Sequence, residues 1–107
     1  IVNTGLSKTG CPYVWGSTGP NSFDCSGFTQ WVYRQNGIYI PRTSSEQKAA
    51  AKKVVSLSEL EVGDILWRSG HVGIYIGNGR YVHAPHTGDV VKVSSGVGKF
   101  TCGLRYQ

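Results

Sequence analysis

The sequence lacks closely spaced cysteines. It has three, and no two form a CxxC pair, so a structural zinc site of the usual spacing is not expected. No apolar run approaches the roughly 18 residues that span a bilayer, and we expect no membrane insertion. Basic residues are scattered and do not alternate with aromatics, which disfavours nucleic-acid binding. No signal peptide is present and the chain starts at Ile1, so we expect a mature or excised fragment.

Glycine and positive charge are in excess. Fifteen glycines predict many tight turns and short strands. The length of 107 residues predicts one domain, residues 1–107, and we expect a monomer. A net charge of +5 favours anionic partners such as nucleic acid, membrane surfaces or anionic cell-wall polymers.

The odd number of cysteines leaves two interpretations open. Either one disulfide forms and one thiol stays free, or all three thiols are free. Cys11 and Cys102 are the candidate pair because they lie near the two termini. Their pairing would leave Cys25 unpaired and potentially reactive.

The pattern of residues predicts helices first and strands afterwards. Spacing of i, i+3, i+4, i+7 over 28–35 predicts a helix from about 25 to 36, with Asp24 as N-cap and Gly37 as C′ residue. Overlapping capping boxes in "TSSEQ" predict a second helix from Ser44 to about residue 52. Five strands are expected in "DILWR", "HVGIYIG", "RYVHAP", "DVVKVSS" and "CGLRY". The fold class is therefore α+β with an antiparallel sheet.

Cys25 is the first candidate for chemistry because it begins the longer helix. The exposed N–H groups of a helix start stabilise a thiolate, so we expect a lowered pKa and reaction with iodoacetamide well below pH 8.5. A buried core cysteine is the alternative interpretation.

A thiolate that cleaves an amide also needs a proton donor, and histidine is the usual one. Val72, Ile74 and Ile76 claim the core face of their strand, which leaves His71 on the other face. Matching the core faces of the two strands puts His83 on the same face as His71. This register requires an odd loop such as residues 77–79 with a bulge, since a two-residue Asn-Gly turn alone would place His83 opposite Ile74.

The predicted site is therefore a helix-terminal cysteine, a strand histidine and a second histidine that orients the first. A metal site or a solvated sheet face is the alternative for the two histidines.

The chain resembles the NlpC/P60 cysteine peptidases of peptidoglycan over residues 12–86. The resemblance rests on "PYVWGSTGPNSFDCSGFTQWVY", "IPRTSSEQ", "VGDILW" and "GHVGIYIGNGRYVHAP". It implies a papain-like fold with the nucleophile helix packed on an antiparallel sheet of five to six strands. It also implies hydrolysis of the γ-D-glutamyl–diamino acid bond in peptidoglycan stem peptides or muropeptides, with no cofactor or metal, outside the cell or in the cell wall.

The resemblance also implies roles for individual residues. Cys25 is the nucleophile, His71 the general base and acid, and His83 the orienting residue. A fourth residue, Tyr13, would position or stabilise the oxyanion. His86 is a second candidate for the orienting position but has the opposite strand parity.

Three further residues are implied to contact the substrate. Asp24 and Ser26 would meet the free amine of the stem peptide, and helix capping by Asp24 is compatible with this role. Arg42 would meet a substrate carboxylate or be a surface arginine.

Three other functions remain open at this stage. Another papain-like amidase or acyltransferase would use the same cysteine and histidine. A non-catalytic wall-binding module would bury Cys25. Zinc binding would use the cysteine and the histidines together. The sequence carries "WGS" where many family members have "WGG", and Cys11 and Cys102 are not part of the family signature.

Overall fold

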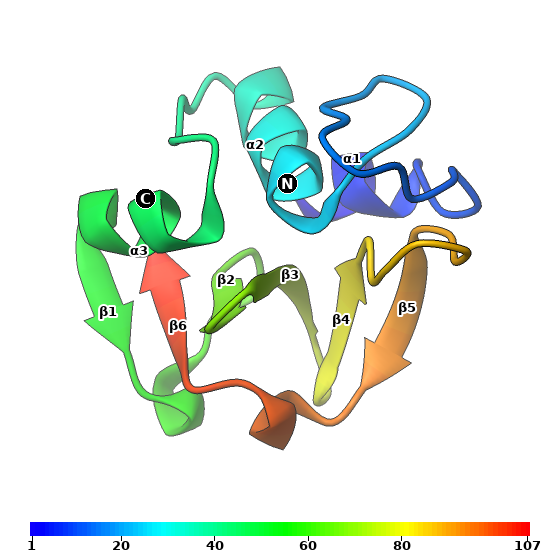
Figure 1. Cartoon of the computed structure of the whole chain (residues 1–107). Coiled ribbons are helices and arrows are strands. Elements are labelled where there is room, and N and C mark those ends of the chain that lie inside the picture. Colours follow the sequence, from blue (N-terminus) through cyan, green and yellow to red (C-terminus); the bar gives the residue numbers. More distant parts are fainter.

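A computed structural model describes all residues, 1–107, as helices packed on a single antiparallel sheet (Figure 1). The helices are α1 (Val2–Leu6), α2 (Cys25–Gln35) and α3 (Ser44–Ala50), with 3-10 turns η1 (Leu57–Glu59) and η2 (Val97–Lys99). The strands are β1 (Lys53–Val55), β2 (Ile65–Arg68), β3 (His71–Gly77), β4 (Arg80–His83), β5 (Lys92–Ser95) and β6 (Cys102–Arg105). The strand order is β1-β6-β2-β3-β4-β5, so the predicted α+β class is confirmed.

β1 is the one strand that the sequence pattern did not predict. It is only three residues long, pairs with β6 alone and lies at the edge of the sheet. The expected turn into the sheet therefore contains an edge strand and η1. Three residues are too few for alternation to be recognised against the preceding lysines and alanines.

The helix α2 begins and ends as predicted. The Asp24 side chain accepts a hydrogen bond of 2.7 Å from the Gly27 N–H, which caps the first turn. At the other end Asn36 is the C-cap and Gly37 takes the left-handed conformation (φ +80°).

The helix α3 is attached to α2 through a buried glutamine. Thr43 and Glu46 form the predicted capping box. The second overlapping box does not form, because the Gln47 side chain is fully buried and donates instead to the carbonyls of Ser26 and Pro41. Thr29 in α2 donates to Gln47 Oε1 at 2.9 Å. The start of α2 and the start of α3 are therefore held together.

The three helices lie over one face of the curved sheet (Figure 1). Two clusters fill the space between them, one centred on Phe28, Val32 and Ile74, the other on Tyr33, Ile65 and Leu104. The opposite face, expected to lie outside the core, has a small cluster of its own. There Leu66, Tyr81 and Phe100 are buried together with side chains from around η1 and η2.

The hairpin between β3 and β4 combines both features that seemed to compete in the sequence. Asn78 and Gly79 both have positive φ, as in a two-residue turn, and Gly77 pairs with Arg80. A bulge between Tyr75 and Gly77 then shifts the register by one residue. The expected three-residue loop is thus a two-residue turn plus a bulge, and the predicted face of β4 is confirmed.

All three cysteines are free thiols, so the disulfide suggested for Cys11 and Cys102 is wrong. The reason is their position across the sheet. Cys11 bonds through its backbone to Val91 next to β5, whereas Cys102 lies in β6, with β2, β3 and β4 in between.

None of the helices has the length and apolar character needed to cross a membrane.

Candidate active site

Cys25 lies at the first turn of α2, partly exposed, against the beginning of β3. Its Sγ is 3.9 Å from the Gly70 carbonyl oxygen and close to the Val72 N–H, the backbone groups on either side of His71. Gly27 lets the loop that contains Ser17 approach the first turn of α2, because a Cβ at position 27 would lie 2.2 Å from the Ser17 carbonyl oxygen. The loop before α2 can therefore pack directly on the helix start.

His71 and His83 form a chain of hydrogen bonds that ends at Ser94. His71 Nε2 lies 2.8 Å from His83 Nδ1, and His83 Nε2 lies 2.9 Å from Ser94 Oγ. The prediction that both histidines share one face is confirmed. A Cβ on Gly73 would lie 3.2 Å from the His83 Cβ, so glycine leaves room for the second ring.

Aromatic rings hold the two imidazoles in place. His71 stacks on Phe100, with ring centroids 5.9 Å apart and an angle of 20° between planes. The His83 ring meets Tyr81 edge-on at 4.7 Å. Both histidines are only 7% exposed, and such packing restricts their rotation.

Burial raises the pKa of the Cys25 thiol above its ordinary value. The N–H groups of Val72, Ser26 and Cys25 lower this pKa in part, while the negative charge of Asp24 raises it further. The expectation of a thiolate made by the helix start alone is therefore wrong in its net direction. The helix-start N–H groups do act as expected, but desolvation and Asp24 outweigh them, so the resting sulfur is a thiol.

Burial also lowers the pKa of both histidines, each to about 4. The charges of Arg68 and His86 contribute at His71, and those of His71, Lys92 and Lys99 contribute at His83. The imidazoles are therefore neutral at neutral pH. With a hydrogen on Nε2, His71 can donate to His83 and keep Nδ1 as a proton acceptor.

Asp24 is the centre of a charged network beside Cys25. Its two carboxylate oxygens accept from the N–H groups of Gly16 and Gly27 and from both terminal nitrogens of Arg42, at 2.6–3.1 Å. Arg42 also donates to Ser26 Oγ at 2.9 Å. The hydrogen bond with Asp24 raises the pKa of Arg42, which stays charged. All four usual acceptor positions of the Asp24 carboxylate are thus filled within the protein.

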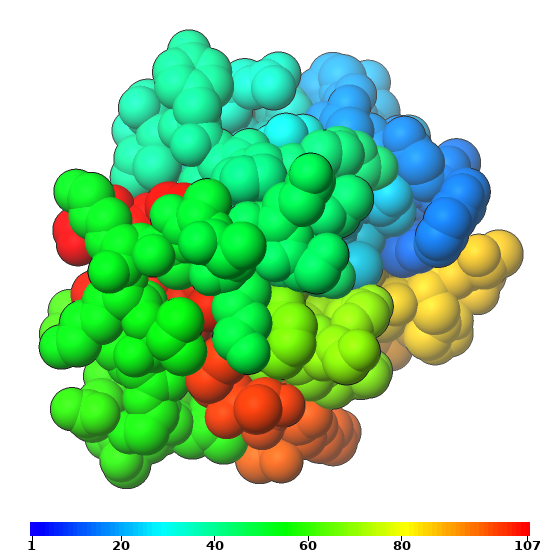
Figure 2. Space-filling model, turned by 60° about the vertical axis from the view of Figure 1, so that its left-hand side comes forward, coloured from blue at the N-terminus to red at the C-terminus, as the bar shows by residue number.

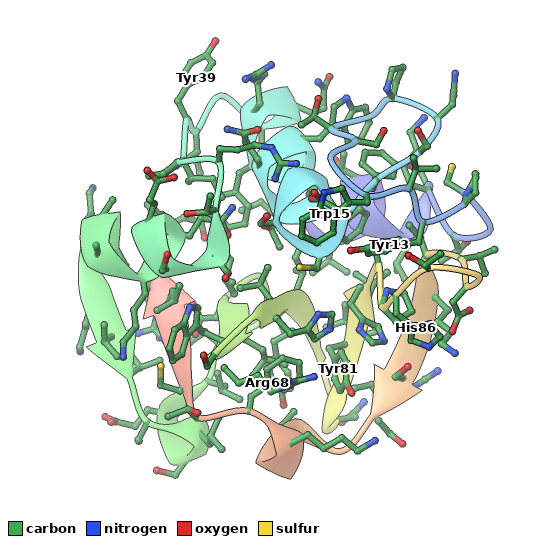
Figure 3. The ribbon with its side chains drawn as sticks, viewed as in Figure 1. Tyr13, Trp15, Tyr39, Arg68, Tyr81 and His86 are labelled. Atoms are coloured by element: carbon green, nitrogen blue, oxygen red, sulfur yellow. The ribbon has the colours of Figure 1, made fainter.

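This network lines a cavity of about 420 Å³, which we call the Asp24 cavity. Its wall also includes Tyr13, Trp15, Cys25 and Gly70. Tyr13 and Trp15 project beside the start of α2 (Figure 3). Burial raises the pKa of Tyr13, with smaller effects from Cys25 and Asp24, so its hydroxyl remains a hydrogen-bond donor.

A second cavity, of about 280 Å³, begins at the next residue, His71, and we call it the basic cavity. Figure 3 labels three of its residues: Arg68 and Tyr81 lie at the lower part of the sheet, and His86 lies beside the connection between β4 and β5. Its wall also includes His83 and Ser94 and the charged residues Asp89, Lys92 and Lys99. In the space-filling view the β3 segment is visible between α3 and the orange-red C-terminal segment (Figure 2).

The seven residues to which the sequence analysis assigned a role line these two neighbouring cavities. Cys25, Tyr13, Asp24, Ser26 and Arg42 line the Asp24 cavity, and His71 and His83 line the basic cavity. No three His, Cys, Asp or Glu side chains converge as a metal site would require. Sequence reasoning missed Ser94 and Arg68. Strand parity could have placed Ser94 opposite Tyr81, as observed, but the pairing of β4 with β5 was not predicted from sequence.

Comparison with known proteins identifies the family. The family model described as NlpC/P60 family matches residues 10–102. A Corynebacterium glutamicum protein named "Probable endopeptidase" is 54% identical over 87 residues, which are 78% of this chain and 41% of that protein. The γ-D-glutamyl-L-lysine dipeptidyl-peptidase of Bacillus subtilis is 39% identical, over 87% of this chain and 34% of that enzyme.

Comparison with solved structures gives the same family. The NlpC/p60 domain of the peptidoglycan hydrolase SagA has a TM-score of 0.86 and 40% identity, and the match covers 96% of this chain and 93% of that domain. The chain spans about two fifths or less of the two curated relatives named above. The family model and these relatives cover the segments that carry Cys25, His71 and His83, and the chain belongs to the NlpC/P60 family.

Proposed function

We propose that the chain is a cysteine endopeptidase that cleaves peptidoglycan stem peptides, with Cys25 as nucleophile, His71 as general base and acid, and His83 as orienting residue. The observation that carries the proposal is the 2.8 Å bond from His71 Nε2 to His83 Nδ1, on a strand whose first residues flank the Cys25 sulfur. The family and the names of its members support a peptidase.

The first half of the reaction begins from two neutral groups. As the substrate carbonyl approaches, the Cys25 proton moves to His71 Nδ1 and the sulfur attacks the carbonyl carbon. The His71 Nε2–H stays bonded to His83 Nδ1, so the imidazolium keeps one orientation. His71 then gives its proton to the leaving amine, the C–N bond breaks and a thioester remains on Cys25.

The oxyanion of this step needs donors beside the sulfur. The backbone N–H of Cys25 lies at the helix start, where it has no partner within the helix. The Tyr13 hydroxyl shares the same cavity and stays protonated. We assign both as donors to the developing charge.

In the second half, water replaces the leaving amine. His71 takes a proton from this water, and the resulting hydroxide attacks the thioester. The carbon–sulfur bond breaks, the sulfur takes the proton back from His71, and the product acid loses its proton to water and leaves as a carboxylate.

The Asp24 cavity is proposed to hold the amine end of the stem peptide. The Asp24 carboxylate has its acceptor positions filled, so the ammonium would bond to the remaining lone pair of Ser26 Oγ and feel the Asp24 charge at longer range. The two terminal nitrogens of Arg42 bind Asp24, and we propose that Arg42 holds this carboxylate in place instead of binding a substrate carboxylate.

The bond cleaved is proposed to be the one between γ-D-glutamate and the diamino acid. The Bacillus subtilis relative is named for a γ-D-glutamyl-L-lysine bond. With such a substrate we place the action of the protein outside the cell or in the cell wall, acting as a monomer.

The test is digestion of defined muropeptides with identification of products by mass spectrometry. The wild type should release a fragment ending in γ-D-glutamate, and Cys25→Ala should release none while keeping its circular dichroism spectrum. Turnover by Cys25→Ala at the wild-type rate would end the proposal. Joined peptides or cleavage at another amide would indicate an acyltransferase or a different amidase.

A further inference from the structure

The basic cavity has a charge imbalance that the proposed reaction does not use. Four basic side chains line it, Arg68, His86, Lys92 and Lys99, against one carboxylate, Asp89. Asp89 is already paired, with Lys92 Nζ at 2.8 Å and His86 Nε2 at 3.5 Å. Arg68 and Lys99 form no ion pair in the structure. The cavity therefore holds two cations without a partner.

Such a cavity attracts an anionic ligand, and a carboxylate fits its side chains. A concave surface lined by charges of one sign concentrates ligands of the opposite sign. An arginine can bind a carboxylate through two parallel N–H donors, and a lysine adds a point charge. Arg68 and Lys99 are both exposed side chains at this wall, so a ligand can reach them.

The position of the basic cavity indicates which part of the substrate it would bind. Gly70 lines the Asp24 cavity and the next residue, His71, lines the basic cavity, so the two cavities are neighbours at the start of β3. Under the proposed function, on which this inference rests, the amine end of the stem peptide fills the Asp24 cavity and the bond is cut at Cys25. The fragment beyond the cleaved bond, which leaves as the amine, then extends past His71 into the basic cavity.

We propose that the basic cavity binds a carboxylate of the leaving fragment through Arg68 and Lys99. Two sources supply this carboxylate. One is the side chain of the diamino acid, which bears a carboxylate in diaminopimelate and none in lysine. The other is the C-terminal carboxylate of the stem peptide. The volume of about 280 Å³ suits a single amino-acid residue better than a larger ligand.

The bound carboxylate would also assist the histidines. Arg68 and His86 lower the pKa of His71, and Lys92 and Lys99 lower that of His83, after burial as the main cause. An anion between these cations opposes their field where His71 becomes an imidazolium. Substrate binding on the leaving side would then favour the proton transfer that starts the reaction.

The experiment uses four peptides with the same acyl side. The leaving residue is diaminopimelate or lysine, each with a free C-terminal acid or a C-terminal amide. The measured quantity is a ratio of two kcat/KM values. The numerator is the peptide that carries the carboxylate in question, and the denominator is the matched peptide that lacks it. Each ratio is taken within one protein, so a loss of folded protein cancels.

The wild type should prefer the carboxylate form by about tenfold, and the double variant Arg68→Gln/Lys99→Gln should bring the ratio close to one. Lys53→Gln, which removes an exposed cation on β1 outside both cavities, should keep the wild-type ratio. The pair of peptides that shows the preference identifies the source of the carboxylate.

Two results separate the failures. Hydrolysis by the wild type with equal rates for acid and neutral peptides, or a preference that the double variant retains, overturns this inference alone. No hydrolysis of any of the four peptides overturns the proposed function and this inference with it.

Discussion

The two cavities that meet at Gly70 and His71 differ in how their charges are balanced. In the Asp24 cavity the carboxylate and Arg42 neutralise each other at 2.6 Å. In the basic cavity Asp89 pairs with Lys92, and Arg68 and Lys99 are left over. The charges of the Asp24 cavity are balanced before substrate binds, and those of the basic cavity are not.

This difference shows how the groups proposed to be catalytic, a thiol and an imidazole, can lie between cavities of unlike charge. Burial is the main cause that raises the pKa of the Cys25 thiol and lowers that of the histidines; the Asp24 charge adds to the first shift, and nearby cations add to the second. Both effects favour the neutral pair of thiol and imidazole. Under the proposed function, the proton of Cys25 would move to His71 only after the bound substrate has changed the charges around them.

Replacing His71 removes the side chain at the boundary of the two cavities and should have the largest effect. We expect His71→Ala to lower kcat about 10³-fold, since the proton acceptor for Cys25 is lost. Stopped assays on muropeptide quantify the rate, and thermal unfolding checks the fold. A loss of less than tenfold would show that another base serves the thiol.

Removing the Asp24 charge should turn the balanced cavity into an unbalanced one. Asp24→Asn can still cap α2, but it leaves Arg42 without an anionic partner, at a cost of about 1–2 kcal/mol in unfolding free energy. The pKa of the Cys25 thiol should fall, so alkylation by iodoacetamide at pH 7.5 should be several-fold faster than in the wild type. Arg34→Gln, an exposed cation on α2, is the control. Unchanged alkylation would contradict the influence of Asp24.

Replacing Ser94 tests the last hydrogen bond of the chain that lines the basic cavity. Ser94→Ala leaves His83 Nε2 without its 2.9 Å partner, and we expect kcat to fall about twofold to tenfold with little change in KM. Ser95→Ala, at the next position and exposed, should behave as wild type. Equal kinetics of the two variants would show that the His83–Ser94 bond does not contribute to turnover.

The last prediction concerns stability alone, through its pH dependence. An unfolded histidine has a pKa of about 6.5, whereas His71 and His83 have values of about 4 when folded. Below pH 6.5 the unfolded state therefore binds more protons, and stability should fall from pH 6.5 to about 4. Urea midpoints for the wild type and for His83→Gln give the comparison. The variant should lose less stability across this window, and parallel curves would rule out His83 as a cause.

The sequence predicted well whatever depends on local pattern. The Asp24 cap, the capping box at Thr43 and the shared face of His71 and His83 all follow from short-range spacing, and the structure confirms each. The bulge was required by the hydrophobic pattern before any coordinates, because a register slip would move a whole strand to the wrong face.

Features that depend on distant segments were not predictable from one chain. The pairing of Asp24 with Arg42 and the position of Ser94 behind His83 join residues 18 and 11 positions apart on different elements. The thiol pKa was predicted in the wrong direction because a helix start is visible in the sequence and the depth of burial is not. The disulfide failed for the same reason, since closeness to both termini says nothing about strand order.

The raised pKa of the Cys25 thiol has a consequence for its resistance to oxidation. Oxidation to sulfenic acid proceeds through the thiolate, so a sulfur that keeps its proton reacts slowly with oxidants. Under the proposed function, the nucleophile would therefore be protected in the resting protein and vulnerable only while its proton is transferred during turnover.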